Sequence, residues 1–230
     1  MSVRYRWYQI RIPRSCHDYA SLFAARPFSA DTQHGFQSLA EISGNSRYRF
    51  LWRDRVLIST LDSYGAPAFH SVESVNFKEF CLFEKKGSYF LRIESPGRSL
   101  RELFNALEDL FGFGFSCTPI TFAQSRPQLI FSAVDSSKLV GLKVSGAVLG
   151  EDVVARMEFA SKHGMDVNEM SVLSSLRYNV DFASFDIAHQ GIRGTVAFFA
   201  NGVAKIGGQL APLLLELLER DLPELLTSAS

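Results

Sequence analysis

The amino-acid sequence predicts an α+β fold in which antiparallel β-hairpins are each followed by an amphipathic helix. Three observations predict this arrangement. Several segments place apolar residues at every second position, glycine-containing turns separate some of these segments, and other segments repeat apolar residues at helical spacing. A chain that combines half-buried strands, tight turns and amphipathic helices is typical of a fold in which helices pack on an antiparallel sheet.

The first strands are expected in the amino-terminal quarter of the chain. The run 3–12 (VRYRWYQIRI) reads as a strand, and the run 47–55 (RYRFLWRDR) alternates more cleanly. Successive side chains of a strand point to opposite faces, so Tyr48, Phe50 and Trp52 are predicted to join the core while four arginines face outward. The intervening residues 15–46 are polar and mixed, and we expect a long loop there that can include a short helix.

A hairpin and a helix are predicted next. Two strand-like runs within residues 75–95 flank Glu84-Lys85-Lys86-Gly87, where the glycine takes the left-handed conformation of a tight turn easily. The helix, residues 98–111, carries an apolar stripe. A capping box of Ser99 with Glu102 is expected at its start, and Gly112 is expected at its end.

The second half of the chain repeats this mixture. We expect a strand in 138–149, a helix from about Glu151 to His163, and another short helix in 167–176. Strands return in 177–206, and a last helix begins at Pro212, since a proline in the first turn loses no needed hydrogen bond.

The glycine-rich run 196–210 (VAFFANGVAKIGGQL) raises the question of a phosphate-binding loop. Its lysine precedes the last glycines and no serine or threonine follows, so the order differs from that of a P-loop. Asn201-Gly202 is instead a hairpin signal, and Gly207-Gly208 lets the chain enter the last helix. A structural role is therefore expected, with anion binding by the amides before Pro212 as the alternative.

Two domains are predicted. Pro119 and Pro127 lie in a polar stretch, so residues 1–125 are assigned to a basic β-rich subdomain and residues 126–230 to an α+β subdomain that ends in a leucine-rich helix. The run 75–82 (VNFKEFCL) is similar to the run 180–187 (VDFASFDI), which leaves open that the two halves are similar and arose by duplication.

The composition is that of a globular protein, with 47% hydrophobic and 21% charged residues. No apolar run reaches the ~18–20 residues of a membrane-spanning helix, and the charged first residues lack the apolar centre of a signal peptide. Three widely spaced cysteines, five histidines without metal-ligand spacing and the lack of a dinucleotide motif predict no metal and no cofactor. We therefore expect a cytoplasmic protein without a membrane partner.

Arginines give the main functional signal. Residues 1–55 hold nine arginines and four acids, which leaves a charge of +5, whereas the remaining residues carry 15 basic and 20 acidic groups. Arginine binds phosphates bidentately, so the predicted nucleic-acid or anion-binding residues are Arg47, Arg49, Arg53, Arg55, Arg4 and Arg6. The aromatic rings lie on the other face, which favours contact with the backbone of a nucleic acid. A charged edge strand and pairing with the chain's own acids are the alternatives.

The carboxyl-terminal helix gives a second signal. Its leucines cover more than one face, and such a helix is either buried within the chain or paired with a partner. The second alternative assigns a homodimer interface to Leu213, Leu214, Leu217 and Leu218, since symmetric dimers are the commonest oligomers.

Three function hypotheses follow. The first is a non-enzymatic binding or assembly protein, a homodimer or a subunit of a complex, whose arginine face contacts a nucleic-acid backbone. The second is an enzyme with a dispersed active site, nuclease-like for example, because catalytic groups need only converge in space. Its candidate residues are Glu84, Lys86, His70, Cys16 and Asp181. The third is a purely structural subunit.

Overall fold

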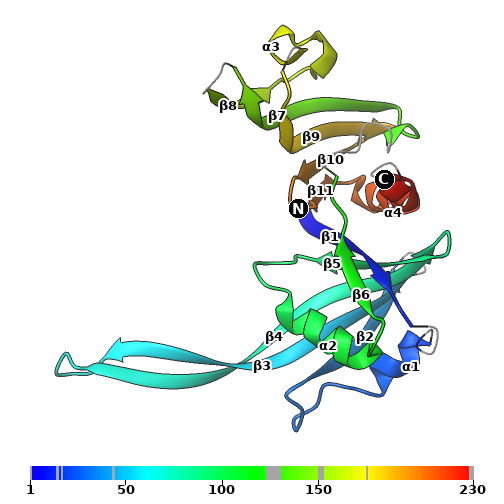
Figure 1. Cartoon of the computed structure of the whole chain (residues 1–230). Helices are drawn as coiled ribbons and strands as arrows, with labels where there is room; N and C mark the ends of the chain where they lie inside the picture. Colours follow the sequence, from blue (N-terminus) through cyan, green and yellow to red (C-terminus); the bar gives the residue numbers. More distant parts are fainter. Residues whose placement is uncertain are drawn as a thin grey trace. The chain divides into compact units, whose positions relative to one another are not determined.

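The computed structural model of the chain describes residues 2–13, 16, 18–42, 45–122, 131–149, 153–174 and 176–227. These residues form eleven β-strands and four α-helices (Figure 1). They group into two compact units, each considered by itself. Unit 1 comprises Met1–Gln9, Glu84–Ser88 and Thr118–Ser230, and unit 2 comprises Ile10–Phe83 and Tyr89–Cys117.

Unit 2 is built on an antiparallel sheet with strand order β2-β3-β4-β5. Its elements are α1 (Tyr19–Ala24), β2 (His34–Ile42), β3 (Asn45–Leu61), β4 (Pro67–Lys85), β5 (Ser88–Glu94) and α2 (Arg101–Phe111); β6 (Ser116–Pro119) follows along the chain. The core is aromatic. The ring of Phe23 from α1 lies 4.8 Å from Phe36, 4.4 Å from Tyr48, 5.6 Å from Phe80 and 6.0 Å from Phe111, measured between ring centroids.

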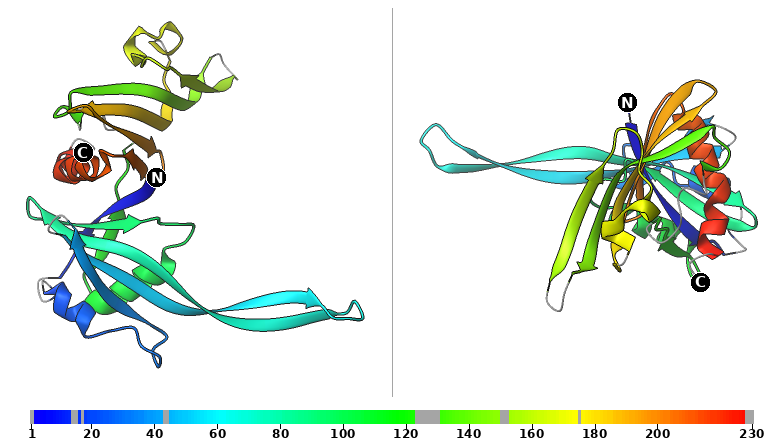
Figure 2. Two further views of the ribbon diagram at one scale, coloured as in Figure 1. Left: turned by 180° about the vertical axis from the view of Figure 1, so that it is seen from behind. Right: turned by 90° about the horizontal axis from the view of Figure 1, so that it is seen from above.

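Strands β3 and β4 form a hairpin that outruns the rest of the unit 2 sheet. Their paired residues extend from Arg47 and Cys81 to Leu61 and Pro67, whereas β2 pairs with β3 only as far as Trp52. The outer part of the hairpin, residues 54–76, therefore projects as a two-stranded ribbon, drawn in cyan (Figures 1 and 2). We call this segment the arm.

Unit 1 is built on a second run of antiparallel strands, in the order β1-β11-β10-β9-β7-β8. Its elements are β1 (Ser2–Arg11), β7 (Ser136–Val148), β8 (Val154–Ala160), η3 (Val167–Glu169), α3 (Ser171–Ser174), β9 (Asn179–His189), β10 (Ile192–Phe199), β11 (Val203–Gly208) and α4 (Ala211–Thr227). Helix α4 contacts β10 and β11.

The two faces of the unit 1 sheet differ in chemistry. Val196 of β10 pairs with Ile206 of β11 and with Phe185 of β9, and all three side chains are buried on the face that α4 covers. Leu214, Leu218 and Leu222 of α4 are fully buried. Because side chains alternate along a strand, the residues between these positions form the opposite face, where Asp186, Thr195 and Lys205 are exposed.

The predicted fold class is wrong. Strands follow one another without an intervening helix from β2 to β5 and from β9 to β11, so hairpins that are each followed by a helix do not describe the chain. The run 75–82 lies at the end of β4, in a hairpin that precedes α2, whereas the run 180–187 lies in β9, two strands before α4. The described residues form mostly antiparallel sheet, with few helices.

Three local predictions are also wrong. Residues 154–160 form strand β8 where a helix was predicted, because residues 141–148 of β7 pair with them and their burial alternates with a period of two. Residues 34–42, predicted as loop, form β2. The capping box is absent from α2: Leu100 is the N-cap residue, and Ser99 Oγ accepts from the amide of Arg101 at 3.4 Å.

Other local predictions are confirmed. Lys86 and Gly87 have φ of 49° and 76° and form the two-residue turn between β4 and β5. Gly112 ends α2 with φ of 71°. Gly208 has φ of 86°, and a Cβ there would lie 2.7 Å from the carbonyl oxygen of Arg193, so the exit from β11 requires glycine. The predicted domain boundary at 125/126 lies outside the described residues. Among the described helices, none is long and apolar enough to cross a membrane.

Candidate anion-binding site

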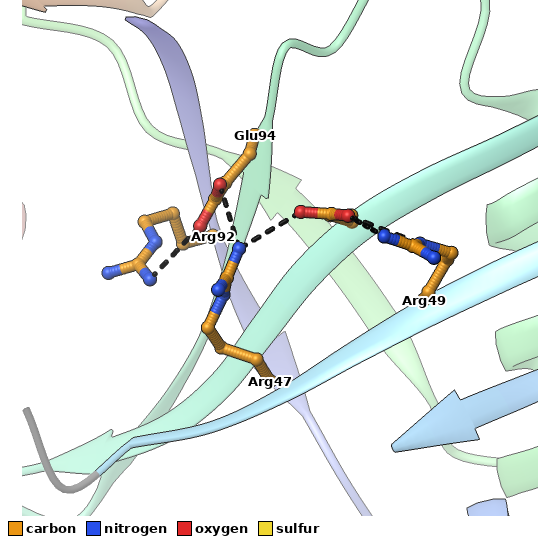
Figure 3. Close-up of polar contacts among 5 residues, drawn as sticks. Arg47, Arg49, Arg92 and Glu94 are labelled. Carbon is orange, nitrogen blue, oxygen red and sulfur yellow. Dashed lines mark hydrogen bonds and ion pairs between the residues drawn. The ribbon is translucent and has the colours of Figure 1, made fainter. Parts of the chain in front are cut away.

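The arginines of β3 lie beside carboxylates from neighbouring strands. Arg49 stands directly opposite Glu79 of β4, because the β3–β4 register pairs these two residues. Arg49 Nε donates to Glu79 Oε1 at 3.1 Å, and its Nη2 contacts the same oxygen. Arg47 Nη2 donates to Glu79 Oε2 at 2.9 Å and to Glu94 Oε2 at 3.2 Å (Figure 3).

A third arginine, Arg92 of β5, completes this cluster. Its side chain is buried, and its Nη2 lies 3.5 Å from Glu94 Oε1 (Figure 3). Three guanidinium groups thus share two carboxylates in a half-buried position. We call Arg47, Arg49, Glu79, Arg92 and Glu94 the arginine–glutamate cluster. Within it, the acids neutralise most of the charge that Arg47 and Arg49 would otherwise present to a ligand.

The two remaining arginines of β3 also contact their own chain. Arg53 donates to the carbonyl oxygens of Thr32, Ser29 and Ala30 at 3.1, 3.2 and 3.0 Å, and its guanidinium lies 5.3 Å from the ring centroid of Phe28. Arg55 forms an exposed ion pair with Glu73 at 3.4 Å. The binding role predicted for these four residues stays a prediction, and their present contacts are with unit 2.

Arg4 and Arg6 of β1 lie in a different setting, on the exposed face of the unit 1 sheet. Arg4 pairs across the ladder with Lys205 of β11, and Lys205 pairs with Ala197 of β10. Both Arg4 and Lys205 are exposed. The half-buried Arg6 lies over the ring of Tyr8, 5.2 Å from its centroid.

A pocket of about 440 Å³ opens on the same face. The ladder places Lys138 of β7, Asp186 of β9 and Thr195 of β10 side by side, since each pairs with the next. Lys162 and Arg193 also line this pocket, together with Ser136 and the backbone of Gly194 and Gly208. The strand register therefore brings Lys138 of β7 and Arg193 of β10 to one pocket, and Lys162, which follows β8, lines it as well.

The lining of this pocket suits an anion. Three cationic side chains stand against one carboxylate, that of Asp186, and the hydroxyls of Ser136 and Thr195 can donate hydrogen bonds. Among the residues that the structure describes, Arg4, Lys138, Lys162, Arg193 and Lys205 form no ion pair. We call these five residues and Arg6 the basic face.

The enzyme candidates have separate surroundings. Lys86 forms an ion pair with Glu224 at 2.8 Å, and Asp181 accepts from Ser145 Oγ at 2.8 Å. Cys16 Sγ lies 3.6 Å from the carbonyl oxygen of Phe111. Glu84 is exposed at the end of β4, and His70 is exposed on the arm. In the described part of the chain, no group of three or more His, Cys, Asp or Glu residues could hold a metal ion.

The leucines proposed for a dimer interface belong to α4. Leu214, Leu217 and Leu218 are buried, and Leu213 is half-buried. Gly194 of β10 gives Leu214 its space, because a Cβ on Gly194 would lie 2.8 Å from Leu214 Cδ1. The apolar side of α4 thus packs on the sheet of its own unit.

Comparison with known proteins adds no relative. No protein-family model matches the chain, and a search of the curated proteins gave no match. The basic face therefore rests on its geometry alone. Sequence reasoning missed Lys138, Lys162, Arg193 and Lys205, because Arg193 and Lys205 are each the single cation of their strand, Lys162 lies in a loop, and Lys138 shares β7 only with Lys143. The one available signal was that Lys138, Arg193 and Lys205 stand at polar positions in otherwise apolar strands.

Proposed function

We propose that the protein is a non-enzymatic binding protein that holds the phosphate backbone of a nucleic acid on the basic face of unit 1. The observation that carries this proposal is the set of exposed cations without ion pairs on one sheet face. Phosphate contacts by Lys and Arg supply most of the affinity in backbone recognition, and they need cations that are free to exchange counterions.

The extent of the basic face fits several phosphates. Arg4 on β1 and Lys138 on β7 lie four strand positions apart in the ladder. At ~4.8 Å per strand, this distance is roughly 19 Å. In a stacked helical strand successive phosphates advance ~3.4 Å along the axis, so the face spans about five such phosphates, and fewer of an extended single strand.

Aromatic residues on the same face favour a single-stranded ligand. Phe182 of β9 and Phe199 of β10 pair across the ladder, are half-buried, and have ring centroids 5.1 Å apart. Lys143 Nζ lies 5.9 Å from the centroid of Phe182. Unpaired bases stack on aromatic side chains next to a cationic track, whereas bases in a duplex are not accessible for such stacking.

The experiment is fluorescence anisotropy of a labelled oligothymidylate with the full chain. The double variant R193Q/K205Q removes two cations of the basic face, and we expect its affinity to fall at least about tenfold. The slope of log K against log salt concentration should become less steep by roughly 1.4, since each lost contact with a single strand changes it by ~0.7.

Two matched variants separate this proposal from a general charge effect. R98Q/R101Q removes two exposed cations from unit 2, and R47Q/R49Q removes the cations of β3 that contact Glu79. We expect both to keep the wild-type affinity under conditions where they are folded. Absence of binding at low salt, or an equal loss in R98Q/R101Q, would contradict the proposal. A duplex that binds as tightly as the single strand would contradict the stacking role of Phe182 and Phe199.

A further inference from the structure

The arm exposes large apolar side chains along its whole length. Eight of them are between 43% and 95% exposed: Val56, Leu57, Ile58, Leu61, Tyr64, Phe69, Val72 and Val75. At ordinary side-chain areas they present on the order of 900 Å² in total over the two faces and the tip of the arm. The largest apolar patch on a typical monomer is roughly 300–600 Å² and is often functional. Apolar surface of this size marks a site of interaction.

The arm is a defined structure with open backbone edges. At its tip, Asp62 Oδ1 accepts from the amides of Tyr64 and Ala66 at 2.8 and 2.9 Å, and Gly65 has φ of 79°. Strand β2 pairs with β3 only as far as Trp52. Strand β5 has seven residues and follows the turn at Lys86-Gly87, so β5 lies beside the carboxyl-terminal part of β4 and not beside the arm. A lone two-stranded ribbon is marginally stable in water, and its edges are where further chains add.

The register of the arm divides its side chains between two faces. Leu57 pairs with Ser71, Phe69 with Ser59, and Leu61 with Pro67, so Leu57, Leu61 and Phe69 share one face. Val75, opposite Arg53, lies on this face as well. We call it face A. The other face, face B, carries Val56 opposite Val72 and Ile58 opposite His70. The side chains of face A are the more exposed, at 48–71% against 43–47%.

The charge of the arm excludes two kinds of partner. Its residues include one basic side chain, Arg55, against the three acids Asp54, Asp62 and Glu73. A net negative ribbon repels a nucleic-acid backbone and anionic lipid headgroups. Face A carries only Arg55 and Glu73 of these charged residues, whose charges cancel, so it does not repel face A of a second copy. The hydrocarbon of a bilayer would also leave the N–H and C=O groups of the open edges without hydrogen bonds. The chemistry of the arm is therefore that of a protein-binding surface.

We propose that face A packs against face A of a second copy of this chain, about a two-fold axis. Its four apolar side chains expose roughly 500 Å² per copy, so a pair of arms buries on the order of 1,000 Å², the lower limit for a specific interface. About a two-fold axis the same residues of both copies form the contact, so one set of residues closes the dimer. The Arg55–Glu73 ion pair lies on the same face and supplies a polar element within the contact.

The test is sedimentation velocity of the full chain over a concentration series up to ~100 µM, which detects the micromolar Kd that an interface of this size supports. We expect a reversible monomer–dimer equilibrium. The variant L57S/F69S, which removes apolar area from face A, should raise Kd at least about tenfold. These side chains are exposed, so the far-UV circular dichroism and the oligonucleotide affinity should stay at wild-type values.

The matched control is V56S/I58S, which removes apolar side chains from face B of the arm and should leave Kd within about twofold. A wild-type chain that stays monomeric overturns the proposal, and so does a dimer that L57S/F69S leaves intact. Equal weakening by both variants overturns the assignment to face A. Flotation of monomeric wild-type chain with phosphatidylcholine–phosphatidylserine vesicles, lost in L57S/F69S, would show that the arm binds a membrane and would also overturn the proposal.

Discussion

The arginines of β3 and the cations of the basic face differ in what surrounds them. Arg47 and Arg49 stand close together in the sequence, and both contact Glu79 of the adjacent strand. Lys138, Arg193 and Lys205 are far apart in the sequence, and among the described residues they form no ion pair, although Asp186 stands opposite Lys138. The dense run of arginines thus provides internal contacts, while the scattered cations form a positive surface.

This difference teaches that the density of charge along a chain is a poor guide to free charge on a surface. A cation in a strand stands opposite a residue from another strand, and that residue decides whether the charge is neutralised. Arg49 stands opposite Glu79, whereas Lys205 stands between Arg4 and Ala197. The comparison can be tested by substituting the β3 arginines or the residues that contact them.

The largest effect is expected from Glu79→Gln. This change leaves Arg47 and Arg49 half-buried without the carboxylate that they share, so the free energy of unfolding should fall by about 2 kcal/mol. Urea denaturation of the purified chain measures it. The change also removes a negative charge beside Arg47 and Arg49. If the affinity for oligothymidylate rises about tenfold, phosphate binds at β3 and the contrast between β3 and the basic face is wrong.

A smaller effect is expected from Arg53→Lys. Lysine keeps the charge, but its ammonium cannot reach the carbonyls of Ser29, Ala30 and Thr32 together, nor lie flat over Phe28. We expect a loss of about 1 kcal/mol in the free energy of unfolding, with unchanged oligonucleotide affinity. If the free energy of unfolding is unchanged and the affinity for the oligonucleotide falls instead, Arg53 contacts a ligand, which contradicts a purely internal role for this residue.

The smallest effect is expected at the exposed pair of Arg55 and Glu73. Both side chains are mostly exposed, at 78% and 63%, and their separation is 3.4 Å. In the monomer, solvent screens such a pair, so at protein concentrations well below the dimer Kd a double-mutant cycle with Arg55→Gln and Glu73→Gln should give no measurable coupling in the free energy of unfolding. A clear coupling would show that β3 is organised by ion pairs along its whole length, including the arm.

The sequence by itself determined the features that depend on a few neighbouring residues. The turn at Lys86-Gly87, the end of α2 at Gly112 and the inward face of Tyr48 and Phe50 follow from backbone freedom and from alternation along one strand. These preferences are local, and the tertiary structure leaves them unchanged.

Only the tertiary structure decided which strands became neighbours. Residues 154–160 carry no strong local preference, and pairing with β7 makes them a strand. The meeting of Glu79 with Arg49 joins residues 30 positions apart, and the pocket beside Lys138 and Arg193 depends on the register of β7, β9 and β10. Register is set by the burial of whole sheet faces, which depends on many residues together. No short stretch of sequence could therefore reveal the arginine–glutamate cluster or the pocket beside Lys138 and Arg193.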